Sequence, residues 1–274
     1  MSYKSVMVSV VPGRDNAGIV ATAMEIARSF GATLRGRAAC RPIHSVCRDY
    51  AIPAGLFEED RKQIQKHLRE SEDTYRKAVA GYSGPIDWKG DSCMESLAEH
   101  LAEEAAAADI VVAGMEKREG HDETRQPDLC DLVMQAGRPV LLVPTARPTT
   151  DFNSILVAWK SSREARRAVA DALPLLKRAG DVSLVEIVSG DDHGSAHASV
   201  ARVAGWLTDH GIKAQTKLVA SNQANASQLS EIARDSGADL IVAGAYGYNR
   251  QGRWVLGGIT TELLEGDRCA LLSH

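Results

Sequence analysis

The sequence predicts an α/β protein built from two tandem, doubly wound parallel-sheet domains of Rossmann-like type. Two observations lead to this prediction. The chain contains an internal repeat, and each copy alternates short apolar runs with amphipathic helical segments. Short apolar runs separated by helices are typical of parallel strands that are buried on both faces.

The repeat is visible in segments that recur at nearly fixed spacing. KSVMVSVVPG at 4–13 resembles NSILVAWKSS at 153–162, an offset of 149 residues. AADIVVAGMEK at 107–117 resembles GADLIVAGAYG at 237–247, an offset of 130 residues. Because the second offset is shorter, the first copy carries about 19 extra residues upstream of the second pair.

The insert and the domain boundaries follow from these offsets. We expect the extra residues within 42–76, where DRKQIQKHLRESED indicates a charged, amphipathic helix near 58–79. The segment 144–152, PTARPTTDF, has the Pro and Thr content of a linker. The sequence therefore predicts domains at 1–146 and 150–274.

Each element of the second copy can be justified in turn. The run 154–159 predicts a buried strand, and Ser161 and Glu164 after it have the spacing of a helix capping box. The first copy repeats the order, with Ser92 and Glu95 as another capping box. The remaining strands of the second copy are expected at 181–188, 213–219, 238–245 and 269–273, and its helices along the apolar face 165–176 and at 198–211, 227–236 and 256–264.

Composition excludes several functional classes. The 32 basic and 36 acidic side chains leave a net charge of -4, whereas general nucleic-acid binders carry a basic excess. No apolar run reaches the roughly 18 residues of a membrane span, and the start MSYKSVMVSVVPG lacks a secretory signal. We expect a cytoplasmic protein that binds neither nucleic acid nor membranes.

Catalytic and metal-binding patterns are weak. The five cysteines form no C-x-x-C pair and no zinc-like spacing. A D-D-H-x3-H cluster at 191–197 allows a metal-dependent hydrolase, but a solvated polar loop explains it better. The sequence has neither a G-x-S-x-G nor an H-E-x-x-H motif, so it indicates no nucleophile and no general base.

The strongest candidate site is the glycine-rich loop after the strand that ends at Ala243. In an open parallel sheet, ligands bind beyond the carboxyl ends of the strands. The glycines permit positive φ and close backbone approach, a helix start adds partial positive charge, and two arginines are nearby. The candidate residues are Gly244, Gly247, Arg250, Arg253, Gly257, Gly258 and Thr260.

Two interpretations of this loop compete. The glycines can serve tight turns while the arginines face water, or together they can hold a phosphate. The place between a buried strand and a helix favours the anion site. The loop is neither a Walker A sequence nor a Rossmann G-x-G-x-x-G.

The glycine spacing carries a family resemblance. Gly244, Gly247 and Gly257 resemble the G-x2-G-x9-G-[S/T] signature of universal stress proteins, with Ile259 and Thr260 following as they often do in that family. The strand motifs ILVAW and GADLIVAG are also similar. The resemblance covers nearly the whole chain, in tandem, and implies an adenine nucleotide alpha hydrolase-like fold.

The resemblance also implies a ligand and an assembly. In nucleotide-binding members the loop holds the phosphates of ATP, so it implies ATP or AMP here, with Mg²⁺ as a companion ion. The closing strands of that family pair between subunits, which in a tandem chain would join 140–143 to 269–272 as an intramolecular pseudo-dimer. Further homodimerisation and protein partners stay open.

This sequence departs from the family pattern at three places. Gly258 stands where ATP-binding members have Ser or Thr, and Lys160 where many members have Asp. In the first copy Pro127 and Asp128 replace the glycine pair, and acidic residues follow Gly114, so phosphate would be repelled there. We expect the site of the first copy to be lost.

Two functions therefore remain in competition. The first is a stress-response regulatory protein that binds an adenine nucleotide in its C-terminal domain, with at most slow hydrolysis. The alternative is an interaction module in which both nucleotide sites are degenerate. Trp159, beside Lys160, is expected to pack between sheet and helix rather than stack on a base.

Overall fold

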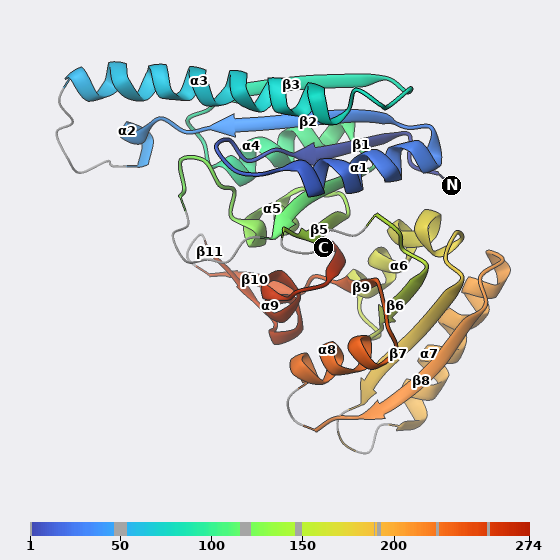
Figure 1. Cartoon of the computed structure of the whole chain (residues 1–274). Coiled ribbons are helices and arrows are strands. Elements are labelled where there is room, and N and C mark those ends of the chain that lie inside the picture. Colours follow the sequence, from blue (N-terminus) through green and yellow to red (C-terminus); the bar gives the residue numbers. More distant parts are fainter. Residues whose placement is uncertain are drawn as a thin grey trace. The chain divides into compact units, whose positions relative to one another are not determined.

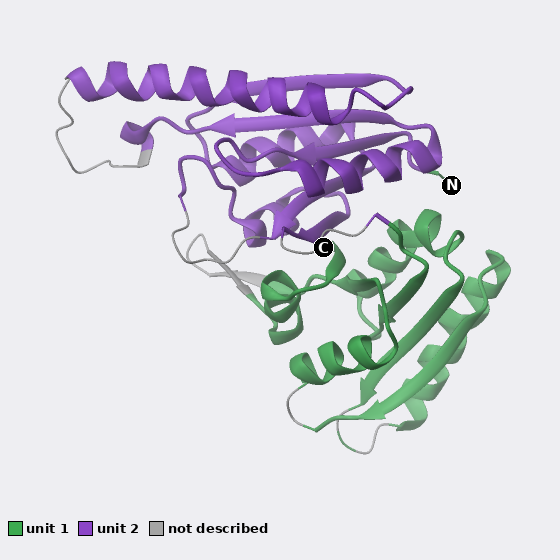
Figure 2. Cartoon of the chain, viewed as in Figure 1, with its two compact units in different colours: residues 1–2, 151–274 green, residues 3–150 purple. Residues whose placement is uncertain are grey.

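The computed structural model describes residues 2–46, 54–115, 122–145, 150–188, 190, 193–222, 225–250 and 253–274. The side chains of 46, 54, 248–250 and 253–255 are not among the described features. The chain divides into two compact units, residues 3–150 (purple in Figure 2) and residues 1–2 with 151–274 (green). Among the described residues, no helix is long and apolar enough to cross a membrane.

The N-terminal unit is a five-stranded parallel sheet with helices on both faces (Figure 1). Its strand order is β3-β2-β1-β4-β5. The elements are β1 (Ser5–Ser9), α1 (Ala17–Phe30), β2 (Thr33–Cys40), α2 (Ile43–Val46), α3 (Ala54–Ala78), β3 (Ile86–Ser92), α4 (Leu97–Glu104), η1 (Ala105–Ala107), β4 (Ile110–Met115), α5 (Leu129–Gln135) and β5 (Val140–Pro144).

Alternation along β2 shows which helix covers which face. A Cβ on Gly36 would lie 2.8 Å from the ring of Tyr75 on α3, whereas the next residue, Arg37, contacts Glu104 on α4. Because successive side chains of a strand point to opposite faces, α3 and α4 cover opposite faces of the sheet. The unit is therefore doubly wound, as predicted.

The C-terminal unit repeats this architecture. Read as β8-β7-β6-β9-β12, its strand order matches that of the first unit position by position, and its described neighbours pair in parallel. The elements are β6 (Ser154–Ala158), α6 (Arg163–Leu176), β7 (Asp181–Val188), α7 (His193–Asp209), β8 (Ala214–Ala220), α8 (Asn225–Asp235), β9 (Leu240–Gly244), β10 (Gly247–Arg250), β11 (Arg253–Leu256), α9 (Gly258–Glu265) and β12 (Cys269–Ser273).

The core of each unit lies where the repeat motifs predicted it. The central strands are apolar and fully buried because both of their faces are covered by helices. Val8 and Val112 have 0% exposed area in the first unit, and Val242 and Leu271 have 0% in the second. These strands hold their carboxyl ends in place, and the loops that follow them are therefore the natural place for a site.

Both predicted capping boxes are in the wrong register. Helix α6 is capped by Ser162, whose hydroxyl accepts from the Ala165 N–H at 3.1 Å, and not by Ser161. Helix α4 is capped by Ser96, whose hydroxyl accepts from the Glu99 N–H at 3.1 Å. In one case the predicted serine still belongs to the preceding strand, and in the other it lies in the turn before the helix. In both, the next serine along the chain has the extended conformation of an N-cap.

The charged insert is α3, and its polar appearance hides a buried stripe. Ile64 and Tyr75 within the helix are 4% and 1% exposed, and Val79, the residue that follows it, is 1% exposed. The Tyr75 hydroxyl donates to the Leu34 carbonyl at 3.1 Å, and its ring lies 5.0 Å from that of Trp88. Residues 60–79 are thus packed against β2 and β3, while the opposite side of the helix remains solvated.

Candidate functional site

The glycine-rich loop of the C-terminal unit is closed at its base by residue 246. The Gly257 N–H donates to the Tyr246 carbonyl at 2.9 Å, and the Tyr246 N–H donates to the Thr260 hydroxyl at 3.2 Å. The β10–β11 hairpin extends between these two points, with Gly247 opposite Leu256. The sequence predicted an irregular loop here, and the structure corrects this prediction to a hairpin. The hydrogen bond between Tyr246 and Gly257 joins the two residues that flank the hairpin.

Gly244 has a packing role at the end of β9. A Cβ at this position would lie 2.5 Å from the backbone nitrogen of Ala165 and 2.6 Å from the carbonyl carbon of Glu164. Because both contacts are backbone atoms of the first turn of α6, they cannot move aside cheaply. The missing side chain lets α6 approach the carboxyl end of β9.

Gly257 and Gly258 form the start of α9. Gly257 is the N-cap residue, with φ -68° and ψ 152°, and no side chain caps the helix. Gly258 is exposed, and a Cβ built on it would have none of the described atoms within 4 Å. The first N–H groups of α9 thus have no capping side chain and lie at the positive end of the helix dipole, beside an exposed glycine, a combination that suits an anion.

The described glycines of the site do not act through positive φ, contrary to the expectation from the sequence. The glycines with positive φ lie elsewhere in the described chain: Gly13, Gly31, Gly137, Gly190, Gly211 and Gly237. The predicted site glycines 244, 247, 257 and 258 are not among them. What they provide is space, at Gly244 for a helix and at Gly258 for solvent or a ligand.

Thr260 lies inside the unit rather than on its surface. It is 2% exposed, and its hydroxyl already accepts the Tyr246 N–H. It braces the loop, and only its backbone N–H in the first turn of α9 is oriented for an anion. The side chains of Arg250 and Arg253 lie outside the described features, although their backbones pair across the hairpin.

Tyr246 is the residue that sequence analysis missed. Its side chain is 60% exposed, and its Cδ1 would lie 3.6 Å from a Cβ on Gly257. An exposed aromatic ring beside an uncapped helix start offers a stacking surface next to an anion site. The signal in the sequence was the tyrosine between two glycines, which the motif treats as a variable position.

The corresponding helix of the first unit is already neutralised. Helix α5 begins after Asp128, whose carboxylate accepts the Asp131 N–H at 3.1 Å, and Asp131 adds a second carboxylate to the first turn. These charges occupy the helix end that a phosphate would need. Glu116, Glu119 and His121, from the same predicted loop, lie outside the described residues.

In the first unit, Arg125 also joins the loop after β4 to the inserted helix α3. The guanidinium of Arg125, which is 9% exposed, donates to the carbonyls of Arg41 and Thr124 at 3.1 and 2.9 Å. It also contacts His67 at 3.3 Å and Asp60 at 3.5 Å, both on α3. The inserted helix therefore lies over the carboxyl end of β2 and holds the loop that follows β4.

The remaining sequence candidates have structural roles or lie outside the description. Trp159 is 6% exposed and its Nε1 donates to the Ser199 hydroxyl at 2.9 Å, so it packs as predicted, while Lys160 is exposed. Asp191 and Asp192 of the D-D-H-x3-H cluster lie outside the described residues, and its histidines, 193 and 197, are exposed on α7.

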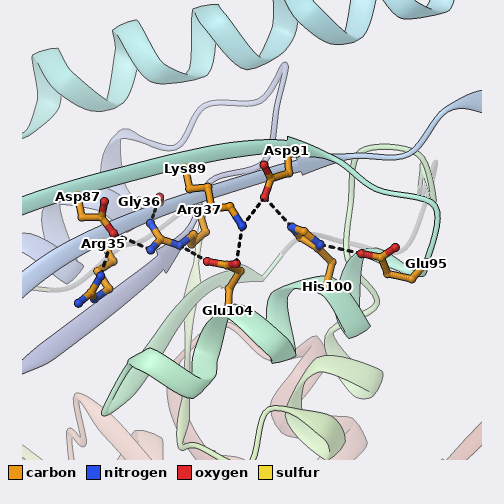
Figure 3. Close-up of polar contacts among 9 residues, drawn as sticks. All are labelled: Arg35, Gly36, Arg37, Asp87, Lys89, Asp91, Glu95, His100 and Glu104. Atoms are coloured by element: carbon orange, nitrogen blue, oxygen red, sulfur yellow. Dashed lines mark hydrogen bonds and ion pairs between the residues drawn. The ribbon is translucent and has the colours of Figure 1, made fainter.

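A chain of alternating charges lies between β2, β3 and α4 (Figure 3). Arg37 pairs with Asp87 at 2.6 Å and with Glu104 at 2.7 Å, and Lys89 bridges Glu104 and Asp91 at 2.8 and 2.9 Å. Hydrogen bonds from Glu104 and Asp91 raise the pKa of Lys89 to about 12. The Arg37 hydrogen bond outweighs burial and lowers the pKa of Asp87.

Groups with metal-ligating chemistry lie within this network. Asp91, His100 and Glu104 bring ligand atoms within 4.8 Å of one another. However, the His100 ring contacts Asp91 at 3.2 Å and Glu95 at 2.8 Å, and the Lys89 ammonium lies between Asp91 and Glu104 (Figure 3). The carboxylates are thus already paired with cations of the chain, which is the arrangement of a structural ion network.

The strand order, the site glycines and the contrast between the two helix starts define a class of protein. It is a tandem, doubly wound α/β protein whose second copy has an open helix start. No family model and no curated protein matches the sequence. Solved structures match over the whole length, and the fold is that of universal stress proteins.

Three of these structures show the extent of the similarity. A universal stress protein from Archaeoglobus fulgidus DSM 4304 is 11% identical, with a TM-score of 0.69 over 98% of this chain and 97% of its own. A candidate universal stress protein from Pseudomonas aeruginosa UCBPP-PA14 is 14% identical, with a TM-score of 0.66 over 99% and 93%. A functionally unknown protein from Pseudomonas aeruginosa PAO1 is 16% identical, with a TM-score of 0.60 over 99% and 92%.

Proposed function

We propose that this chain is a tandem universal stress protein that binds one adenine nucleotide, ATP or AMP, at the start of α9 in its C-terminal unit. It acts in this proposal as a regulatory binding protein of the stress response rather than as an efficient enzyme. Mg²⁺ would accompany ATP through the phosphates. The similarity of fold and the glycine spacing support the proposal together.

One observation carries it: the two copies differ at the same helix start. In the first copy the Asp128 carboxylate caps α5, and Asp131 follows in the first turn. In the second copy Gly257 leaves α9 uncapped, the first turn holds no acidic residue, and Gly258 opens to solvent. A phosphate is attracted to the second helix end and repelled from the first.

The rest of the loop fits a ligand of nucleotide size. The exposed ring of Tyr246 lies next to the uncapped helix start, so a base could stack on it while the phosphates accept the α9 N–H groups. No residue described around this loop is placed as a general base, so we expect hydrolysis to be slow.

The test is calorimetric titration of nucleotide-stripped protein with AMP and with ATP, with and without Mg²⁺. We expect one equivalent to bind per chain. Gly258→Asp places a carboxylate at the helix start, in open space, and should weaken binding by about tenfold or more. Gly258→Asn is the matched neutral control and should bind more tightly than the Asp variant.

Each contrary outcome has a distinct meaning. Equal affinity of the Asp and Asn variants would move the nucleotide away from α9. Absence of heat and of thermal stabilisation at millimolar nucleotide would refute the proposal and favour the interaction module. Two equivalents per chain would refute the asymmetry of the two copies.

A further inference from the structure

A second cavity lies in the C-terminal unit, between α6 and α7 beyond the end of β6. Its volume is about 430 Å³, within the range of small-molecule sites. Its described lining comes from α6, α7 and the turn after β6, and includes none of the described side chains at 244–247 and 256–260. The lining residues that the argument uses are Trp159, Arg166, Val169, Ser199, Arg202 and Trp206.

Two indole rings supply aromatic surface that is already held in position. The Trp159 Nε1 donates to the Ser199 hydroxyl at 2.9 Å, which fixes the ring at the base of the cavity. The half-buried Trp206 ring lies 4.2 Å from the His210 ring, and the His210 Nδ1 contacts the Trp206 carbonyl at 2.9 Å. Such prepositioned rings bind planar ligands at low entropic cost.

Two guanidinium groups face the same cavity from opposite helices. Arg166 on α6 and Arg202 on α7 are exposed, and within the described chain neither forms an ion pair. The acidic residues of α6 are engaged by other arginines: Glu164 lies 3.4 Å from Arg163. Asp171 likewise lies 3.8 Å from Arg167.

The lining therefore combines positive charge with aromatic and aliphatic surface. Among the described residues that line the cavity, the charged ones are the two arginines, so this lining is positive. Guanidinium groups bind carboxylates or phosphates with two parallel hydrogen bonds and also stack on aromatic rings. An uncharged ligand would form no ion pair with either arginine, and a small inorganic anion would not contact the indoles and Val169.

From this combination we infer that the α6–α7 cavity is a binding site for a small aromatic anion. The ring lies against Trp159 and Trp206, and the anionic group accepts hydrogen bonds from Arg166 and Arg202. The site is independent of the nucleotide proposed at α9, and it gives the C-terminal unit a second ligand. No covalent step is involved.

The test uses 1-naphthoate as the probe, with two analogues that each lack one feature. Neutral 1-naphthalenemethanol keeps the rings, and cyclohexanecarboxylate keeps the charge. The full-length protein is titrated by calorimetry, and tryptophan fluorescence is recorded in parallel. We expect 1-naphthoate to bind with quenching, and both analogues to bind at least about tenfold more weakly.

Variants assign the binding to the cavity. The double substitution Arg166→Gln and Arg202→Gln should weaken 1-naphthoate binding by about tenfold or more, because both charge-assisted contacts are lost. Arg163→Gln, on the same helix but outside the lining, is the matched control and should change affinity less than about twofold. Circular dichroism and the melting temperature check that the variants are folded.

Three results would overturn the inference. One is the absence of 1-naphthoate binding at millimolar concentration, and another is equal affinity of the double variant and the Arg163→Gln control. The third is displacement of 1-naphthoate by AMP in the wild type together with weakened AMP binding in the double variant, since that would make the cavity part of the nucleotide site. Gly258→Asp should leave 1-naphthoate affinity unchanged, which separates this failure from failure of the nucleotide proposal.

Discussion

At the scale of single residues, the same amino acid serves opposite purposes in one loop. Gly244 is required because backbone atoms of α6 lie within 2.6 Å of the place of its Cβ, whereas no described atom lies within 4 Å of that place at Gly258. Only the second position is free to accept a ligand. A glycine motif in the sequence does not distinguish these two roles. They are distinguished by the atoms that surround the place where a Cβ would lie.

The two glycines make opposite predictions for substitution by alanine. Gly244→Ala forces a Cβ to 2.5 Å from the Ala165 nitrogen, so we expect a loss of about 1–3 kcal/mol in the free energy of unfolding. Gly258→Ala, the control, should stay within about 0.5 kcal/mol of wild type or be slightly more stable. Urea denaturation followed by circular dichroism measures both, and equal stability of the two variants would contradict the packing role of Gly244.

At the scale of elements, the ion network joins three segments that are distant in sequence. Arg37 on β2 is 67 residues from Glu104 on α4, and Asp87 on β3 lies between them in the chain. Burial alone would raise the pKa of Glu104, but the hydrogen bonds from Lys89 and Arg37 reverse this and lower it. The network therefore links protonation to the packing of α4 on the sheet.

The sign of the pH dependence follows from these shifts. Because the folded-state pKa values of Asp87 and Glu104 lie below their ordinary values of 3.8 and 4.5, their contribution is present above about pH 4.5 and is lost as pH falls through the folded values. The free energy of unfolding should therefore fall less between about pH 5 and pH 3 in Glu104→Gln than in the wild type. Glu103→Gln, its exposed neighbour, is the control.

Thermal melting across this pH range measures the effect. The melting temperature of wild type and of Glu103→Gln should fall steeply with pH, and that of Glu104→Gln should start lower and fall less. Parallel curves for wild type and Glu104→Gln would show that the network does not link protonation to folding.

Sequence analysis predicted the elements better than it predicted their contacts. Apolar runs such as 240–244 and the repeat offsets were sufficient for the strands, because a buried parallel strand has few alternatives. The capping serines, the β10–β11 hairpin and the Arg37 network were not found. Each depends on which side chain meets which backbone group across the fold, and that register is not a local property of the sequence.

At the scale of the whole molecule, duplication has produced two copies of one architecture with unequal openings. In the first, Asp128 caps α5, and Arg125 joins the loop after β4 to α3. In the second, α9 begins uncapped and a further cavity opens between α6 and α7. The first copy thus preserves the fold while the second keeps the features of a binding site.

This asymmetry predicts where a nucleotide slows hydrogen exchange. The two units unfold locally in their own cooperative segments, and a ligand stabilises the segments that it contacts. With saturating AMP, amide exchange measured by mass spectrometry should slow in 244–265 and remain unchanged in 122–135. The Gly258→Asp variant, with the same AMP, should lose the protection of 244–265. Protection of 122–135 in the wild type would mean that the Asp128 carboxylate and the Arg125 contacts leave room for a ligand, and the first copy would then be a second working site.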